Sequence, residues 1–260
     1  MKPISLARKA IKTAVLPYGL VARRRAGDLT ILLYHRVGDR PDEIELSGAV
    51  FERHLAALSE RERVLTLDDA LAGREGGVVV SIDDGYRDFH ERVVPLLVRF
   101  RIPAVLYLAT GLVADGGPAG PDALTWEHLR EAVGTGLVTV GAHTHGHVDL
   151  SDATEDVADG EMRRSQELIE DHLGVPCRHF AYPWAVGSLA ADRVARRLFD
   201  SAALDAWKTN RRGRTDPHRL GRTPVLRSDG TLFFSARARG LLEGEALAYR
   251  LLRRGPWRPP

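Results

Sequence analysis

The sequence predicts an α/β fold in which parallel β-strands close into a barrel. Continuously apolar, β-branched runs such as Val78-Val79-Val80 are typical of strands buried on both faces. Helix patterns alternate with these runs, which favours parallel strands joined by helices. About six such units over roughly 200 residues favour a barrel over an open sheet. A doubly wound open sheet is the alternative, but its usual glycine-rich turn is missing, because His35-Arg36-Val37 follows the first strand.

The elements can be justified in order along the chain. The first strand covers 31–34 and leads to a helix from 50 to about 59. The later patterns are strands at 78–82, 104–109, 137–142 and 180–182, and helices at 86–100, 126–133, 154–172 and 189–198. Thr154 is a suitable helix start and Gly174 a suitable stop, and Pro95 is expected to bend its helix. Beyond Trp207 the pattern becomes loops, with an edge strand expected at 223–226.

The formal net charge of +2 combines three unlike segments. Residues 1–25 carry a local charge of +7 with no acid, and the chain from Trp207 onward carries +9. The span between them carries −14. We therefore expect a basic, amphipathic N-terminal segment at 1–28, a catalytic domain at 29–235 and a basic tail at 236–260.

Several classes of protein are excluded by composition. The single cysteine, Cys177, rules out an intramolecular disulfide and a cysteine-based zinc site. The sequence contains no run of 18 uncharged apolar residues, so no transmembrane helix is predicted. The basic ends lack an aromatic-interleaved motif, so no nucleic-acid partner is expected.

The N-terminal segment has three interpretations. Lys9 and Lys12 interrupt the apolar run that a cleavable export signal needs, so a signal is the third choice. Apolar residues at helical spacing suit either a helix packed on the domain with a solvated basic face or an interfacial helix on anionic lipid. We therefore expect a cytoplasmic protein or one that associates peripherally with a membrane through residues 1–25, without a clear cleavable signal.

Ionisable side chains follow three of the best-defined strands. Asp83-Asp84 follows one strand, His143-Thr144-His145-Gly146-His147 follows another, and His35 follows the first. In an α/β barrel the strand ends carry the chemistry, so these side chains are expected at one rim. Alone, Asp-Asp-Gly is most often a turn, a spaced histidine pair often occurs by chance, and a single histidine often belongs to the core. In combination and in this order they indicate a site.

A metal explains why two carboxylates are adjacent. Like charges a few ångströms apart raise one pKa, and a divalent ion removes that cost for one of them. Two imidazoles, from His143 and His147, with one carboxylate leave an open position for water, as in catalytic zinc sites. The second carboxylate can then accept a proton from that water. His145 is a further candidate ligand.

These motifs resemble those of the polysaccharide deacetylases, the NodB-type family 4 carbohydrate esterases. Ser81-Ile82-Asp83-Asp84-Gly85 resembles their Thr-Phe-Asp-Asp-Gly motif, and 143–147 matches His-Ser/Thr-x-x-His. Phe180-Ala181-Tyr182-Pro183-Trp184 resembles the third, aromatic-proline motif, and Tyr34-His35-Arg36-Val37 resembles the branch whose last motif is displaced to the N-terminus. The resemblance covers roughly residues 30 to 230 and implies a distorted (β/α)7 barrel.

The resemblance also implies a role for each motif residue. Asp84, His143 and His147 would bind a divalent metal, most often zinc. Asp83 would be the general base and His35 the general acid, with a backbone N–H near Tyr182 and the metal stabilising the oxyanion. Tyr182, Trp184 and Trp126 would offer ring faces to a sugar, although a buried core position is the equal alternative for Trp126. The arginine that orients the base in many members is not found, because Ala181 stands where it is expected.

The expected function is removal of N-acetyl groups from a polysaccharide or a lipid-linked sugar precursor. Two alternatives remain: hydrolysis of an O-acetyl or another small amide or ester, and a catalytically silent glycan-binding protein on the same fold. The four side chains at 83, 84, 143 and 147 argue against the silent protein, because binding alone does not require all four.

Overall fold

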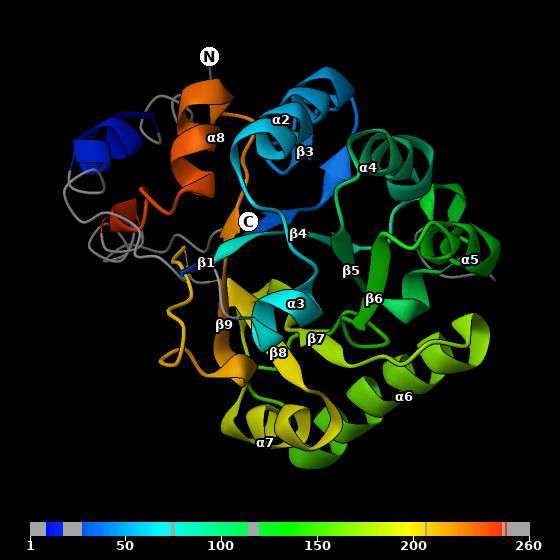
Figure 1. Cartoon of the computed structure of the whole chain (residues 1–260). Helices are drawn as coiled ribbons and strands as arrows, with labels where there is room; N and C mark the ends of the chain where they lie inside the picture. Colours follow the sequence, from blue (N-terminus) through cyan, green and yellow to red (C-terminus); the bar gives the residue numbers. More distant parts are fainter. Residues whose placement is uncertain are drawn as a thin grey trace.

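The computed structural model describes residues 9–17, 28–73, 76–113, 120–205, 207–245 and 248. Within these residues, seven parallel strands form a closed barrel, and β1 pairs with both β4 and β9 to close it (Figure 1). The strands are β1 Leu29–Tyr34, β4 Gly77–Asp84, β5 Ala104–Leu108, β6 Val138–Ala142, β7 His179–Ala181, β8 Ser201–Asp205 and β9 Leu220–Pro224. The predicted (β/α)7 barrel is confirmed.

The barrel contains one strand that the sequence did not indicate and one that it placed wrongly. β8 lies between β7 and β9, in a segment without the apolar run of a buried strand. The expected edge strand at 223–226 is wrong, because β9 begins at Leu220 and pairs on both sides, with β8 and with β1. β9 is therefore an interior strand that closes the barrel. A separate two-stranded sheet joins β2 Arg36–Val37 to β3 Glu45–Leu46.

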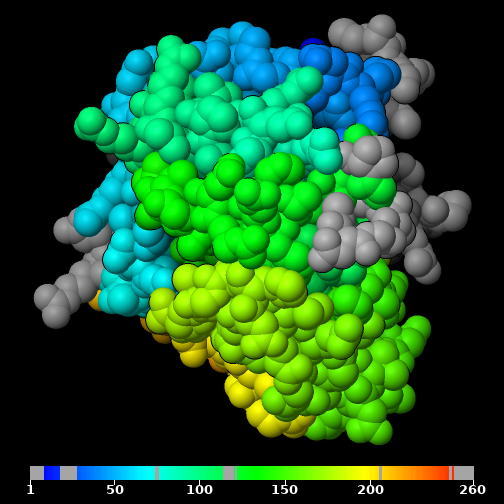
Figure 2. Space-filling view, turned by 90° about the vertical axis from the view of Figure 1, so that its right-hand side faces the viewer, coloured from blue at the N-terminus to red at the C-terminus, as the bar shows by residue number. Residues whose placement is uncertain are grey.

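Helices surround the barrel. They are α2 Gly48–Arg61, α3 Leu67–Ala72, α4 Val94–Phe100, α5 Trp126–Gly134, α6 Glu155–Leu173, α7 Leu189–Leu198 and α8 Gly230–Ala238. Figure 2 shows α4, α5, α6 and α7 as successive bands down one side of the molecule. The expected ends of α6 are confirmed, since Thr154 accepts a hydrogen bond from Val157 N and Gly174 is left-handed at φ 66°.

The expected bend at Pro95 takes the form of a change in helix type. A π-helix, η1 Phe89–Val93, precedes α4, and the two follow each other without a break in the chain. Proline has no N–H to donate to the preceding turn, so the regular hydrogen-bond ladder is interrupted at this point.

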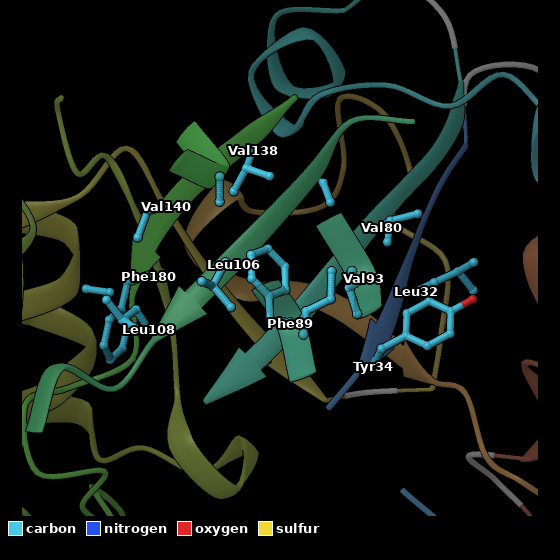
Figure 3. Packing of buried hydrophobic residues seen from close by; sticks show 14 of the residues in the cluster. Leu32, Tyr34, Val80, Phe89, Val93, Leu106, Leu108, Val138, Val140 and Phe180 are labelled. Atoms are coloured by element: carbon cyan, nitrogen blue, oxygen red, sulfur yellow. The ribbon is translucent and has the colours of Figure 1, made fainter. Parts of the chain in front are cut away.

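Two apolar cores follow from the alternation of side chains along the strands. The inner core fills the barrel with residues such as Ile31, Val79 and Val105. The outer core lies between the strands and the helices and includes Leu106 and Phe89 (Figure 3). α3 crosses one end of the barrel in Figure 1 and adds its Leu67 to the inner core, so the end at which the strands begin is closed.

Buried ion pairs join the two ends of the described chain. Lys12, on a helix over residues 9–17, pairs with Asp229 and donates to Ser228 Oγ at 3.3 Å. Arg237, on α8, forms two 2.9 Å hydrogen bonds to Asp229 and one of 2.8 Å to Glu245. Lys12 is fully buried, so the expectation of a solvated basic face is wrong for this residue. Most of the basic segment 1–25 lies outside the described residues.

The expected domain boundary at 235/236 falls inside α8, whose Arg237 belongs to the same buried cluster as Asp229. Within the described ranges, no helix has both the length and the apolar character that crossing a membrane requires.

Candidate functional site

The predicted metal ligands come together where the strands end. Asp84 is the last residue of β4, and His143 directly follows β6. His147 Nε2 lies 3.2 Å and His143 Nε2 3.7 Å from Asp84 Oδ1. One ligand atom from each of the three residues lies within 4.8 Å of the others, a spacing that a single ion can bridge.

The hydrogen bond behind His143 sets the direction of its free lone pair. His143 Nδ1 lies 2.8 Å from the carbonyl oxygen of Ala181. A carbonyl only accepts, so Nδ1 carries the proton and Nε2 presents its lone pair toward Asp84. Burial lowers the pKa of His143, which keeps the imidazole neutral as metal binding requires.

The carboxylate of Asp84 is kept in its charged form. Burial acts to raise the pKa of Asp84. A hydrogen bond from His147, with the nearby His35 and His143, outweighs burial and lowers that pKa to about 2. The neutral imidazole of His143 and the ionised carboxylate of Asp84 therefore share one small space with the imidazole of His147, and this donor set fits a divalent ion such as zinc.

Asp83 is held by an arginine that sequence reasoning missed. Arg222, on β9, donates from Nη1 to Asp83 Oδ1 at 2.6 Å, and both side chains are almost fully buried. The guanidinium also lies over the ring of Tyr107, 5.2 Å from its centroid. The second oxygen, Asp83 Oδ2, faces His143 Nε2 at 3.7 Å. Asp83 thus has one oxygen fixed by Arg222 and the other directed to the ligand cluster.

Strained backbone is concentrated at this site. Five of the seven non-glycine residues with positive φ among the described residues lie here, and they are Asp84, Thr144, His147, Trp184 and Ala185, at φ 79°, 60°, 52°, 56° and 59°. Residues with a Cβ seldom adopt this conformation, at a cost of about 1–3 kcal/mol each, and such residues gather at active sites. Gly85, at φ 102°, leaves no room for a side chain, because an added Cβ would lie 2.4 Å from Leu108.

The three aromatic residues predicted to contact a sugar have different environments. Trp184 is 63% exposed, and its ring meets the ring of His147 at 5.1 Å and 67°. Tyr182 is buried against Phe180, and Trp126 is buried in a stack with His172 at 4.1 Å. Only Trp184 has a ring face open beside the ligand cluster. Trp126 therefore takes the buried core position that was its alternative. Tyr182 is also buried, so it has no ring face open to a pyranose ring.

The remaining predicted groups are only partly brought to the site. His35 is half-buried and close enough to Asp84 for its charge to lower the carboxyl pKa. His145 Nδ1 pairs with Thr110 Oγ1 at 3.0 Å, and His145 is not in the ligand group. The N–H of Tyr182 donates to Ala203 O at 3.0 Å, so the expectation that it stabilises an oxyanion is wrong for that N–H.

Comparison with known proteins finds a family model and several relatives that match this chain. Residues 71–198 match the family model described as polysaccharide deacetylase. The putative polysaccharide deacetylase YxkH of Bacillus subtilis (strain 168) is 22% identical over 171 residues, which are 63% of this chain and 59% of the relative. A poly-beta-1,6-N-acetyl-D-glucosamine N-deacetylase of Staphylococcus aureus (strain MRSA252) is 24% identical over 156 residues, 54% of each protein. The chain spans a little more than half the length of these curated relatives.

Solved structures share the barrel over most of the chain. IcaB from Ammonifex degensii aligns with a TM-score of 0.71 at 28% identity, over 82% of this chain and 97% of that one. The Streptococcus pyogenes deacetylase PplD, solved with acetate, aligns with a TM-score of 0.73 at 21% identity, over 81% and 98% of the two chains.

Proposed function

Through residues 71–198 this chain belongs to the polysaccharide deacetylase family, and on that premise we propose that it is a metal-dependent hydrolase of N-acetylated glycans. The observation that carries the proposal is the pairing of a ligand group, Asp84, His143 and His147, with a separate carboxylate, Asp83. A carboxylate that is held beside the ligands by Arg222 suits a general base. The relatives named for N-deacetylation of a poly-N-acetylglucosamine support an N-acetyl sugar as the substrate.

In the proposed reaction, water attacks the acetamide carbonyl, and the carbon–nitrogen bond breaks to give acetate and a sugar amine. A divalent ion held by Asp84, His143 and His147, most readily zinc, supplies Lewis-acid polarisation of the carbonyl and a water of lowered pKa. Asp83 accepts the proton of the attacking water at Oδ2, since Arg222 occupies Oδ1.

Two further groups complete the proposed mechanism. His35, at the rim beside Asp84, donates a proton to the departing amine nitrogen. Trp184 presents an exposed ring next to His147, where a pyranose ring of the glycan can stack. Hydrolysis of an O-acetyl ester needs the same base and ligands and differs in its alcohol leaving group, which does not require His35 as an acid to the same degree.

The proposal is tested by acetate release from N-acetylglucosamine oligomers. Protein loaded with Zn²⁺ should release acetate, protein stripped with a chelator should not, and added Zn²⁺ should restore the release. O-acetylated glycans assayed in parallel separate the ester alternative. A zinc-loaded protein that releases no acetate from any N-acetyl glycan contradicts the proposal, and glycan binding without turnover would favour the silent alternative.

We also propose peripheral association with anionic membranes through residues 1–25, whose local charge is +7. Basic residues near an anionic surface gain about 1 kcal/mol each, so several together suffice for reversible binding. Co-sedimentation of the full chain with phosphatidylserine vesicles tests this proposal when it is compared with a chain that lacks residues 1–8 and carries Arg23→Ser, Arg24→Ser and Arg25→Ser, because these changes remove five of the seven basic residues. Equal binding of the two chains to the vesicles would contradict it. The shorter deletion leaves Lys12 and its buried ion pair with Asp229 in place.

A further inference from the structure

The segment 143–147 carries both histidines of the ligand group. Two of its residues, His145 and Gly146, anchor it to neighbouring parts of the chain. His145 O accepts the N–H of Gly111 at 2.7 Å, and His145 Nδ1 pairs with Thr110 Oγ1 at 3.0 Å. The His145 N–H donates to the backbone oxygen of Glu161 at 3.1 Å. The Gly146 N–H donates to the Glu161 carboxylate at 2.7 Å. His145 and Gly146 therefore lie between the segment after β5 and α6.

The hydrogen bonds to His145 and Gly146 matter because the residues on either side of this pair, Thr144 and His147, have a strained backbone. Thr144 and His147 have φ values of 60° and 52°, in the left-handed region that residues with a Cβ seldom adopt. Such conformations persist only where surrounding contacts impose them. Within the segment itself, the Val148 N–H donates to Thr144 Oγ1 at 3.2 Å. The bonds from Glu161 act on the two residues between the strained positions.

Glu161 is well suited to impose that conformation. It lies in the second turn of α6, whose Met162 and Ser165 are fully buried and whose Ser165 Oγ reaches Leu108 O at 3.5 Å. The helix is therefore fixed to the barrel. Among the described residues, no ion pair links the Glu161 carboxylate to a basic side chain, and its hydrogen-bond partner is the N–H of Gly146. An ionised acceptor makes a stronger bond to an N–H than a neutral one.

We infer that Glu161 is a positioning residue for the metal site: through His145 and Gly146 it holds His147 with its Nε2 toward Asp84. The inference rests on the proposed function, since it assumes that Asp84, His143 and His147 bind a metal. Glu161 does not touch the ligand group itself, and its effect on binding passes through the backbone of the segment. Groups that orient metal ligands in this indirect way typically change metal affinity about 10- to 100-fold when they are removed.

The test is Zn²⁺ affinity of the full chain, measured by competition with a chromogenic chelator and without any substrate. Glu161→Ala should weaken Zn²⁺ binding about 10- to 100-fold, because the acceptor for Gly146 is lost. Glu161→Gln keeps an oxygen at the same reach and should stay close to wild type. Glu167→Ala is the matched control, since Glu167 is an exposed residue further along α6.

The variants separate positioning from a general loss of stability. Melting of the metal-free proteins should be similar for Glu161→Ala and Glu167→Ala. If Glu161→Ala does not fold, Glu161→Asp replaces it: its carboxylate is one methylene short, so it should bind Zn²⁺ more weakly than Glu161→Gln. Wild-type affinity in a folded Glu161→Ala, or an Asp variant that binds as well as the Gln variant, overturns the inference. A wild-type chain that binds no Zn²⁺ contradicts the proposed function instead.

Discussion

Two clusters of histidine and carboxylate side chains lie at opposite ends of the same barrel. The cluster at the strand carboxyl ends consists of Asp83, Asp84, His143 and His147, with Arg222 behind it. The cluster at the strand amino ends consists of Asp68 on α3, His179 at the start of β7 and Ser201 at the start of β8. In the second cluster, His179 Nδ1 lies 3.0 Å from Ser201 Oγ, and His179 Nε2 lies 3.2 Å from Asp68 Oδ1.

By residue type and distance alone, the amino-end cluster resembles the serine, histidine and aspartate of a hydrolase. Two observations separate it from a reactive site. Ser201 is fully buried and His179 is 1% exposed, whereas at the carboxyl end the side chains of His147 and Asp84 are 20% and 10% exposed. None of its three residues has a positive φ, whereas strained residues gather at the carboxyl end. The exposure of His147 and the backbone strain, more than the residue types, therefore distinguish the candidate functional site from the cluster that closes the barrel.

The largest difference between the clusters should be in turnover. Asp83→Asn removes the proposed base while preserving size, and kcat for acetate release should fall about 10²- to 10⁴-fold. Zn²⁺ affinity should be kept, because Asp83 is not in the ligand group. The same substitution at the other end, Asp68→Asn, should leave kcat unchanged. Equal losses in the two variants, measured by acetate release at saturating Zn²⁺, would contradict the division between the clusters.

The second difference between the clusters is in how much the arginine beside each one stabilises the fold. Arg222 pairs with Asp83 at the carboxyl end, and Arg178 pairs with Asp68 at the amino end. Arg222→Met leaves the buried carboxylate of Asp83 without its charged partner, which should lower the free energy of unfolding by about 3–5 kcal/mol. Arg178→Met removes a contact of the same kind, 2.8 Å from Asp68, but here both side chains are substantially exposed. A loss of about 0–1 kcal/mol is expected there. Denaturant unfolding of the metal-free proteins gives both values.

A double variant shows whether the effect of Arg222→Met comes from the unpaired carboxylate. Asp83→Asn together with Arg222→Met should be less destabilised than the sum of the two single variants, because neither charge is then left buried alone. Additive losses would mean that Arg222 stabilises the barrel through packing on Tyr107 instead.

The two clusters also show what the sequence can predict. The candidate ligands Asp84 and His143 were predictable because they stand at the ends of two predicted strands, 78–82 and 137–142, and parallel strands bring their ends together. His147 was predictable from its spacing of four residues after His143. Arg222 was missed because β9 reads Leu220-Gly221-Arg222-Thr223-Pro224, in which glycine, proline and a charge hide the strand. Its partner Asp83 is 139 residues away.

The other misses have the same physical origin. β8, Ser201-Ala202-Ala203-Leu204-Asp205, is made largely of small residues that fit the narrow barrel but have little strand preference of their own. The burial of Tyr182 and Trp126, and the bond from Glu161 to Gly146, depend on how helices pack on the barrel. Packing between elements that are distant in the chain leaves no local sequence pattern. One signal for Arg222 was nevertheless present, because it is an arginine in the middle of the strand-length segment 220–224.

The smallest expected difference is in the pH dependence of stability. Burial lowers the pKa of His179 in the folded protein, against the raising effect of Asp68 and Asp200 and with a lowering effect from Arg178. The unfolded chain therefore binds a proton more readily, so stability falls as the pH drops below the ordinary histidine pKa of about 6.5. One such group contributes a slope of at most about 1.4 kcal/mol per pH unit.

His179→Gln should flatten this slope while leaving turnover at neutral pH intact. The measurement is the free energy of unfolding between about pH 7 and pH 5 on Zn²⁺-loaded protein, because bound metal holds His143 and His147 in their neutral form through the same range. Ser201→Ala is the control: it removes the hydroxyl that faces His179 but no titrating group, so its slope should match wild type. It should also release acetate at the wild-type rate, which a nucleophilic serine would not permit. An unchanged slope in His179→Gln would place the acid-sensitive group elsewhere and leave the amino-end cluster a pH-independent closure of the barrel.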